Sequence, residues 1–279
     1  MAHRERVLFP EVGLTGVDLA RYYAQVAGAM VPHLKDRALT LRRWPIGLGG
    51  GCFYQRHLAG RTGSPEGRVP IRIDTVDDLG RWAAQGIVEV HAPLGRLSLA
   101  GRHDWAVVDL DPHPPADFGQ AVAVGEAVAA LLAKLGMPYS LKTSGGRGLH
   151  LYIPVQPVGA DAALAQAERL ARLIRLTWPN ATTLTRTVGR RGGRVYIDYL
   201  QNAGNRTMAA PFSVRGLPEA PVSWPTAWPD IRGRTVPGFT VATVGSGPVP
   251  TFARPPAVDI GECLDRAGIP PLSELRRGF

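Results

Sequence analysis

Two aspartates follow a short apolar run, in the segment Asp109-Leu110-Asp111. The preceding residues, Trp105–Val108, are typical of a buried strand, and residues i and i+2 of a strand face the same side. We therefore expect the two carboxylates to project together, with their Cα atoms roughly 6–7 Å apart by strand rise. Because an unpaired buried charge is costly, both carboxylates need partners.

A third aspartate, Asp198, lies in another short apolar run, Val195–Tyr199. If this run is a neighbouring strand, the three carboxylates form an all-oxygen site suited to Mg²⁺ or Mn²⁺. Clustered carboxylates repel one another unless cations lie between them, so the pattern favours two-metal phosphoryl transfer. The alternative is that these aspartates serve turns and structural pairing.

The segment between these acids, residues 142–150 (KTSGGRGLH), has the composition of a phosphate-binding loop. Its glycines allow backbone N–H groups to approach phosphates, and Lys142 and Arg147 add charge. Ser144 and His150 offer a hydroxyl group and an imidazole. The segment matches neither a P-loop nor a dinucleotide fingerprint. Beside the carboxylates it favours binding of a nucleoside triphosphate; alone it fits equally a plain glycine hairpin with a core histidine.

Arginines flank the third aspartate, and His91 ends a strand-like run earlier in the chain. An exposed basic face is the usual explanation for such a run, but beside a metal site some of these arginines suit a triphosphate or a pyrophosphate leaving group. His91 is a candidate for the same pocket, although a lone histidine is more often structural. The arginines are Arg190, Arg191, Arg194, Arg206 and Arg215.

Two adjacent aromatic residues, Phe53 and Tyr54, follow a glycine loop and have arginines nearby at Arg42, Arg43 and Arg56. Aromatic rings between arginines suit base stacking, at roughly 1–3 kcal/mol per base, together with backbone charge. Because adjacent residues rarely share an environment, we expect one of the two rings to lie in the core.

The composition points to a polyanionic partner. The 279 residues carry a net charge of +9, which favours nucleic acid. Nearly all the basic residues are arginine, which suits contacts with phosphates and bases. A genomic bias explains the high ratio of arginine to lysine equally well, but it does not explain the excess of positive charge. The two cysteines are far apart, which predicts a reduced, cytosolic protein without disulfides. We find no signal peptide and no apolar run near the roughly 18 residues that span a bilayer.

The order of predicted elements is α+β with mixed sheets, not a regular βαβ array. Residues 60–68 are expected to form an exposed loop. The principal helices are predicted at 15–34, 118–135 and 160–177, and the principal strands at 69–73, 86–91, 105–111, 139–142, 149–155, 195–199 and 208–214.

These residues together resemble the polymerase domain of bacterial ATP-dependent DNA ligase D and related stand-alone primase-polymerases of the archaeo-eukaryotic primase superfamily. The resemblance covers nearly the whole chain and rests on three ordered motifs, Asp109–Asp111, Ser144–His150 and Asp198–Asn202. It implies a primase-like α+β catalytic fold, with mixed or antiparallel central sheets flanked by helices. Residues 1–279 are then one catalytic domain, with an N-terminal lobe of about 1–100 and a catalytic lobe of about 101–279.

The resemblance also implies roles for individual residues. Two ions, Mn²⁺ or Mg²⁺, are expected on Asp109, Asp111 and Asp198. The expected nucleotide contacts are His91, Ser144, Arg147, Arg191 and Arg215, to which the sequence of the loop adds Lys142 and His150. Phe53 and Tyr54 match the aromatics that support the template strand, and the expected DNA-binding set is Arg6, Arg42, Arg43, Phe53, Tyr54 and Arg56.

The implied reaction is template-directed addition of an NTP, preferentially, or a dNTP to a DNA primer 3′-hydroxyl, with release of pyrophosphate. The implied setting is gap filling or end extension in bacterial non-homologous end joining, on gapped DNA or DNA with a 3′ overhang. A Ku-like protein and a separate DNA ligase are implied partners, and the expected location is cytoplasmic and nucleoid-associated. The alternatives are a two-metal nuclease and a non-catalytic module that binds DNA ends or gaps and recruits a ligase.

The chain departs from the family pattern at two positions. The family commonly has lysine at the position of Gly16 and a basic residue at Arg6, which bind the 5′-phosphate at the downstream edge of a gap. Here Arg6 keeps its charge, whereas Gly16 has none, and Ile46 replaces the usual Asp or Asn. Catalysis is expected, and recognition of a gap 5′-phosphate is left open. No KxDG adenylation motif occurs, so no ligase activity is expected.

Overall fold

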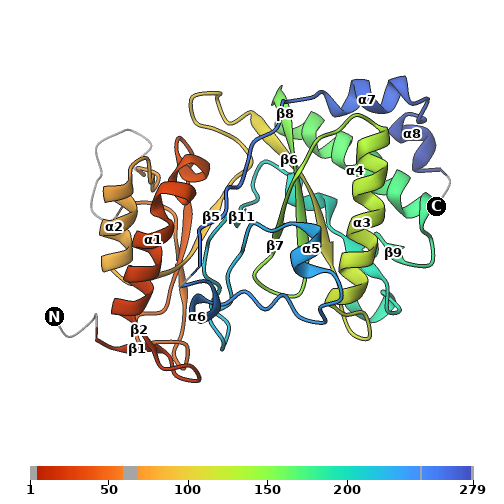
Figure 1. Ribbon diagram of the computed structural model, residues 1–279. Coiled ribbons are helices and arrows are strands. Elements are labelled where there is room, and N and C mark those ends of the chain that lie inside the picture. Colours follow the sequence, from red (N-terminus) through yellow and green to blue (C-terminus); the bar gives the residue numbers. More distant parts are fainter. Residues whose placement is uncertain (1–4, 59–67, 246, 278–279) are drawn as a thin grey trace. The chain divides into compact units, whose positions relative to one another are not determined.

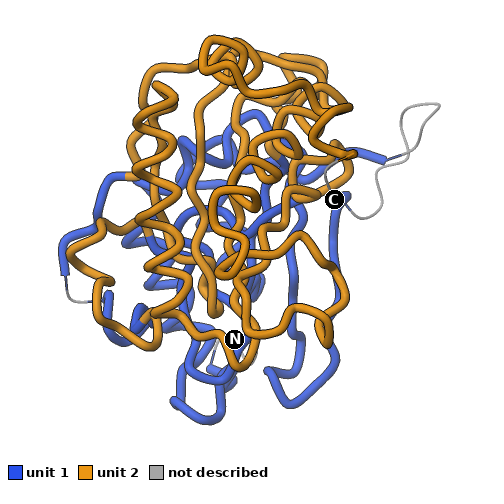
Figure 2. The backbone as a smooth tube through the Cα atoms, turned by 90° about the vertical axis from the view of Figure 1, so that its right-hand side faces the viewer, with its two compact units in different colours: residues 1–93, 207–224, 238–251 blue, residues 94–206, 225–237, 252–279 orange. Residues whose placement is uncertain are grey.

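The computed structural model describes residues 5–58, 68–245 and 247–277, so nearly all of the predicted 60–68 loop lies outside the described residues. The chain forms two compact units (Figure 2). Unit 1 comprises residues 1–93, 207–224 and 238–251, and unit 2 comprises residues 94–206, 225–237 and 252–279. Because the units interleave along the chain, the two predicted lobes with one boundary near residue 100 stay a prediction.

Unit 1 contains a four-stranded antiparallel sheet with the order β11-β5-β3-β4, and the helices α1 and α2 lie side by side (Figure 1). A short hairpin, β1–β2, precedes α1. The elements of this unit are β1 (Val7–Phe9), β2 (Leu14–Thr15), α1 (Gly16–Leu34), β3 (Thr40–Arg43), β4 (Phe53–Gln55), α2 (Val76–Ala84), β5 (Ile87–Ala92), β11 (Met208–Ala209) and α6 (Val241–Val244).

The helix α1 begins with a capping box. The Thr15 hydroxyl accepts a hydrogen bond from the Asp18 amide, and the Asp18 carboxylate accepts one from the Thr15 amide, which completes a capping box. The apolar face of the helix is buried, and the Tyr23 hydroxyl donates to the Val88 carbonyl of β5 at 2.6 Å. This bond ties α1 to β5, the strand that carries His91.

Unit 2 contains a mixed five-stranded sheet with the order β7-β8-β6-β10-β9, in which only the β10–β9 pair is parallel. The predicted α+β class with mixed sheets is therefore confirmed. The elements of this unit are β6 (His103–Asp111), α3 (Phe118–Lys134), β7 (Ser140–Thr143), β8 (Leu149–Val158), α4 (Ala160–Thr177), β9 (Thr182–Thr183), η1 (Val188–Arg190), β10 (Val195–Ile197), η2 (Tyr199–Asn202), α5 (Trp228–Ile231), α7 (Ile260–Arg266) and α8 (Leu272–Leu275).

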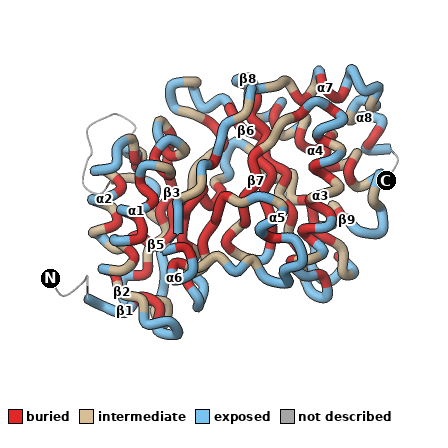
Figure 3. Tube along the Cα trace, in the orientation of Figure 1, coloured by how far each residue is buried: buried red, intermediate tan, exposed pale blue. Residues whose placement is uncertain are grey.

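At β6, one face of the sheet is covered by helices and the other face carries two of the aspartates. The helices α3 and α4 lie on the same side of the sheet (Figure 1). Leu110 faces them, since its side chain comes within 3.4 Å of the place where a Cβ of Gly125 in α3 would lie. Asp109 and Asp111 alternate with Leu110 and so face the opposite side. Most of β6 is buried (Figure 3).

Three predicted strands are shorter in the structure. The predicted strand 195–199 is reduced to β10, and Asp198, which was expected within it, precedes η2 and caps it through its side chain. The predicted strand 208–214 is reduced to β11, because Pro211 has no amide hydrogen to pair and Phe212 adopts a φ of 69°. The predicted strand 69–73 makes only isolated bridges at Pro70 and Ile71. Among the described residues, no helix has both the length and the apolar character needed to cross a membrane.

Candidate active site

Two residues of the 142–150 segment and one aspartate form a row across the sheet of unit 2. Lys142 of β7 lies directly opposite His150 of β8, and His150 lies directly opposite Asp109 of β6. On the far side of Asp109, the Asp198 amide at the end of β10 donates to the Asp109 carbonyl at 3.0 Å. Because directly opposed residues of neighbouring strands project to the same face, the sheet register brings these side chains together.

The contacts within this row hold the imidazole ring of His150 in one orientation. Lys142 Nζ lies 2.8 Å from His150 Nδ1, and His150 Nε2 lies 3.4 Å from Asp109 Oδ1. With Lys142 as an ammonium group, which only donates, Nδ1 accepts and the proton of the neutral ring is on Nε2, facing Asp109. Lys142 is fully buried, and in this arrangement it reaches the site through His150 rather than directly.

Asp198 is held by neighbours that the sequence analysis did not single out. Its carboxylate accepts hydrogen bonds from the Tyr196 hydroxyl at 3.1 Å, from the Gln201 amide at 2.9 Å and from the Leu200 backbone at 3.2 Å. Burial and the nearby charge of Asp109 nevertheless raise the pKa of Asp198 above its ordinary value. Gln201 could have been found, since it belongs to the Asp198–Asn202 motif.

Asp111 is half-exposed and has a cationic partner. Arg191 Nη1 lies 2.9 Å from Asp111 Oδ2, and the Arg191 guanidinium lies 4.1 Å from the centroid of the Tyr196 ring. The Arg191 side chain is buried, and its Nε atom has no hydrogen-bond partner among the described residues. A buried donor without a partner is rare in proteins and suits a ligand oxygen.

The predicted metal ligands Asp109 and Asp111 share one face of β6, and Asp198 follows β10 with its amide bonded to Asp109, but the described residues contain no group of three or more His, Cys, Asp or Glu side chains arranged around a metal position. Asp111 points to Arg191, and Asp198 points to Gln201. The donor set still fits a hard cation: all the ligands are oxygen, and burial together with the neighbouring charge of Asp109, which raises the pKa of Asp198, would be offset by a bound cation. Metal binding stays a prediction.

The loop between β7 and β8 is closed on itself. The Ser144 hydroxyl accepts hydrogen bonds from the amides of Gly146 at 3.0 Å and Gly148 at 3.1 Å, and the Ser144 amide donates to the Gly148 carbonyl at 2.9 Å. These two glycine amides are therefore engaged within the loop, contrary to the expectation that they point to a phosphate. Arg147 is exposed at the tip of the loop.

Two other predicted nucleotide contacts, His91 and Arg215, belong to unit 1 and meet at one carboxylate, Glu89. His91 Nε2 lies 2.6 Å from the Glu89 carboxylate, and Arg215 Nε lies 3.3 Å from it. Sequence analysis missed Glu89. The available signal was a charged residue between the apolar residues of a buried strand.

The predicted DNA-binding residues of unit 1 gather on β3 and β4, where Arg42 pairs with Tyr54 and Arg43 with Phe53. Both rings are exposed, Phe53 by 43% and Tyr54 by 59%, so the expectation that one lies in the core is wrong. The reason is that each ring packs on an arginine instead: Arg43 lies 5.6 Å from the Phe53 centroid, and Arg42 lies 5.4 Å from the Tyr54 centroid. Arg56 is exposed nearby in sequence.

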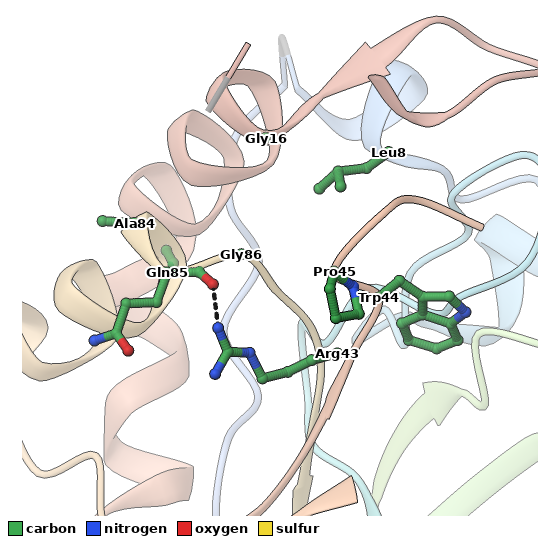
Figure 4. Close-up of a pocket in the computed structure, with 9 residues that line it drawn as sticks. Leu8, Gly16, Arg43, Trp44, Pro45, Ala84, Gln85 and Gly86 are labelled. Carbon is green, nitrogen blue, oxygen red and sulfur yellow. Dashed lines mark hydrogen bonds between the residues drawn. The ribbon is translucent and has the colours of Figure 1, made fainter. Parts of the chain in front are cut away.

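Gly16 lines a cavity of about 370 Å³ in unit 1 that contains none of the three aspartates (Figure 4). Arg43 borders this cavity and donates to the Gln85 carbonyl at 2.5 Å. Arg6 is exposed and donates to the Pro45 carbonyl at 2.7 Å. Ile46 is also exposed, by 64%.

Replacing Lys142 by methionine should lower the turnover number by roughly 10- to 100-fold, the cost typical of removing an outer partner of a ligand at a metal site. Methionine has a similar volume, but it leaves His150 Nδ1 without its donor and frees the ring to change tautomer. Steady-state kinetics would measure the effect. Lys134→Met, at an exposed lysine in the last turn of α3, is the control. Equal turnover in the two variants would contradict the role of the row.

The chain is similar to known proteins over most of its length. Residues 15–247 match the family model described as "LigD, primase-polymerase domain". The chain is 34% identical over 253 residues to a multifunctional non-homologous end joining protein LigD of Mycobacterium bovis, covering 83% of this chain and 33% of the relative. It is 30% identical to the LigD protein of Pseudomonas aeruginosa, covering 81% of this chain and 28% of the relative. The chain thus spans about a third of the length of these relatives.

A solved structure gives the same result. The polymerase domain of Mycobacterium tuberculosis ligase D, in complex with DNA, superposes with a TM-score of 0.79 at 32% identity, over 87% of this chain and 91% of that chain. The fold is therefore that of the primase-like polymerases, which are nucleotidyltransferases. The chain belongs to the LigD primase-polymerase domain family.

Proposed function

We propose that the protein adds nucleotides to the 3′-hydroxyl of a DNA primer under the direction of a template strand. The observation that carries this proposal is that Asp109 and Asp111 share one face of β6, that the Asp198 amide is hydrogen-bonded to Asp109, and that the buried guanidinium of Arg191 pairs with Asp111. An acidic set beside a buried cation suits a reaction in which negative charge moves from an attacking oxygen to a leaving pyrophosphate.

The residues of unit 2 have distinct tasks in this proposal. Asp109, Asp111 and Asp198 would hold two ions, Mg²⁺ or Mn²⁺, which when bound activate the attacking hydroxyl group and stabilise the leaving group. Arg191 offers its unpartnered Nε to a phosphate oxygen. Lys142 and His150 hold Asp109 in place, and Tyr196 and Gln201 hold Asp198. Arg147, at the exposed tip of the loop, adds positive charge for the triphosphate.

Binding of DNA is proposed on three grounds. The net charge is +9, the related polymerase domain of Mycobacterium tuberculosis ligase D was solved in complex with DNA, and the exposed pair Phe53 and Tyr54 offers two ring faces beside arginines. Arg42, Arg43 and Arg56 would contact the phosphate backbone. We further propose, on the resemblance to the family, a preference for NTP over dNTP and a role in gap filling with a Ku-like protein and a separate ligase.

The double change Phe53→Ala with Tyr54→Ala should weaken binding to primer–template DNA by roughly 30- to 10⁴-fold, because each of the two stacked bases contributes about 1–3 kcal/mol. Fluorescence anisotropy at fixed salt measures it. Leu176→Ala removes an equally exposed apolar side chain from α4 and should leave the affinity unchanged. Equal affinity of the double variant and the Leu176 control would refute the stacking role.

A primer-extension assay tests the proposed function. A labelled primer on a gapped template is incubated with NTPs or dNTPs and with Mn²⁺ or Mg²⁺. We expect nucleotide-dependent lengthening, faster with NTPs. Shortening without nucleotide would favour the two-metal nuclease, and DNA binding without any change in length would favour a non-catalytic binding module. Comparing gaps with and without a downstream 5′-phosphate shows whether Arg6 and the cavity at Gly16 serve phosphate recognition without the lysine.

A further inference from the structure

One buried carboxylate in unit 1 gathers three basic side chains. Glu89 is only 1% exposed, and its oxygens contact His91 Nε2 at 2.6 Å, Arg42 Nη1 at 3.3 Å and Arg215 Nε at 3.3 Å. The backbone amide of Gly216 adds a hydrogen bond of 2.8 Å. Glu89 and His91 are two residues apart on β5 and so face the same side of the sheet. Arg42 lies opposite Glu89 on the adjacent strand β3, and Arg215 follows β11 in sequence.

In this cluster the basic side chains surround the carboxylate of Glu89, which carries a negative charge. Burial alone would raise the pKa of Glu89, but the hydrogen bond from His91, the charges of Arg215 and His91, and the Gly216 amide outweigh it and lower the pKa to about 2. Glu89 is therefore ionised at any pH used for an assay. One carboxylate faces two guanidinium groups and an imidazole, so the cluster keeps an excess of positive charge that suits a phosphate.

The three basic groups retain capacity for a ligand. Arg42 Nε is buried without a hydrogen-bond partner among the described residues. The hydrogen bond to Glu89 uses His91 Nε2, which leaves Nδ1 as the second ring nitrogen. The side chains of Arg42, Arg215 and His91 are 28%, 24% and 14% exposed, so each is partly accessible to solvent.

The cluster is continuous with the aromatic residues that are proposed to support the template. The Arg42 guanidinium lies 4.5 Å from the Trp44 ring centroid and 5.4 Å from that of Tyr54. Gly216, whose amide binds Glu89, packs so closely on Trp44 that a Cβ at this position would come within 2.1 Å of the ring. Glu89 thus holds Arg42 from one side while Trp44 and Tyr54 confine its guanidinium.

We propose that Glu89 is a positioning residue that sets two phosphate contacts at once: those of His91 and Arg215 with the incoming nucleotide, and that of Arg42 with the template backbone. This inference rests on the proposed function. It goes further by making one buried carboxylate the common support of nucleotide and template binding. Loss of Glu89 should therefore weaken both kinds of binding together, although Glu89 itself touches neither ligand.

The test is Glu89→Gln, which keeps the size of the side chain and removes its charge. We expect the KM for NTP and the Kd for primer–template DNA each to rise roughly 10-fold or more, since removing one partner of a buried charge pair is costly. The control is Glu126→Gln, which breaks the more exposed ion pair with Arg232 in unit 2 and should change neither constant. If Glu89→Gln does not fold, Glu89→Asp can be measured in its place. Aspartate keeps the charge but has a shorter side chain, so the KM and the Kd should rise less than is expected for Glu89→Gln.

A double-mutant cycle separates positioning from a purely structural role. If Glu89 acts on template binding through Arg42, then Glu89→Gln should add little to the DNA-binding defect of Arg42→Met. Fully additive losses, or constants equal to those of the Glu126 control, would overturn the inference while extension by the unaltered protein continued. If the unaltered protein bound DNA but incorporated no nucleotide, the proposed function itself would fail.

Discussion

Asp109→Asn is expected to reduce primer extension by at least about 10³-fold, because the charge stabilisation supplied by a bound cation amounts to several kcal/mol and each 1.36 kcal/mol is a factor of ten in rate. Asparagine keeps the shape and the contact with His150, but it removes the charge at the centre of the row. Since Asp109 is one cause of the raised pKa of Asp198, the substitution relieves repulsion there, and the fold should tolerate it.

Binding should separate this effect from misfolding. The Kd of Asp109→Asn for primer–template DNA and its thermal midpoint are expected to match those of the unaltered protein, while single-turnover extension is lost. Asp161→Asn, at an exposed carboxylate in the first turn of α4, is the matched control and should extend normally. Normal extension by Asp109→Asn would remove the carboxylates from the mechanism.

Gly148→Ala is expected to destabilise the protein by about 2–3 kcal/mol, roughly 5–10 °C in thermal midpoint for a chain of this size. A Cβ at Gly148 would lie 2.2 Å from the Leu110 carbonyl oxygen and 3.5 Å from the Asp111 Cα, and backbone atoms cannot move aside as a flexible side chain can. The start of β8 would shift away from β6 and carry His150 from its place opposite Asp109. The thermal midpoint, measured by differential scanning calorimetry, and the extension rate should therefore fall together.

A neighbouring glycine provides the control for this change. At Gly146 the nearest atom to a Cβ is Ser144 Oγ, at 3.5 Å, which is ordinary contact. Gly146→Ala should therefore leave both stability and extension close to those of the unaltered protein. If the two alanine variants behaved alike, the close approach of Gly148 to β6 would not be what holds the row in register.

Local patterns predicted the strand of Asp109 and Asp111 well, whereas Asp198 lies beyond the end of β10 rather than within a strand. The apolar run before Asp109 requires a buried strand, and alternation then places Asp109 and Asp111 on one face, as β6 shows. The register that sets Lys142 opposite His150, and His150 opposite Asp109, is a long-range property of three strands, and spacing along the chain does not determine it. The sequence therefore suggested the members of the row but not their order.

The errors of prediction have physical causes as well. Alternation along a strand suggested that either Phe53 or Tyr54 is buried, but cross-strand pairing gives each ring an arginine to cover. Glu89 was not predicted because a buried carboxylate is stable only when basic side chains pair with it. Its partners His91, Arg42 and Arg215 come from three separate segments. Such convergence is visible only in the folded chain.

The most direct test of the proposed carboxylate centre is incorporation of a single nucleotide opposite each of the four template bases in a one-nucleotide gap, with Mn²⁺ or with a chelator. We predict that the complementary nucleotide alone is added efficiently, that the primer grows by one residue, and that the chelator or Asp109→Asn abolishes the product. Addition that ignored the template base, or that survived both the chelator and the Asp109 substitution, would contradict the account.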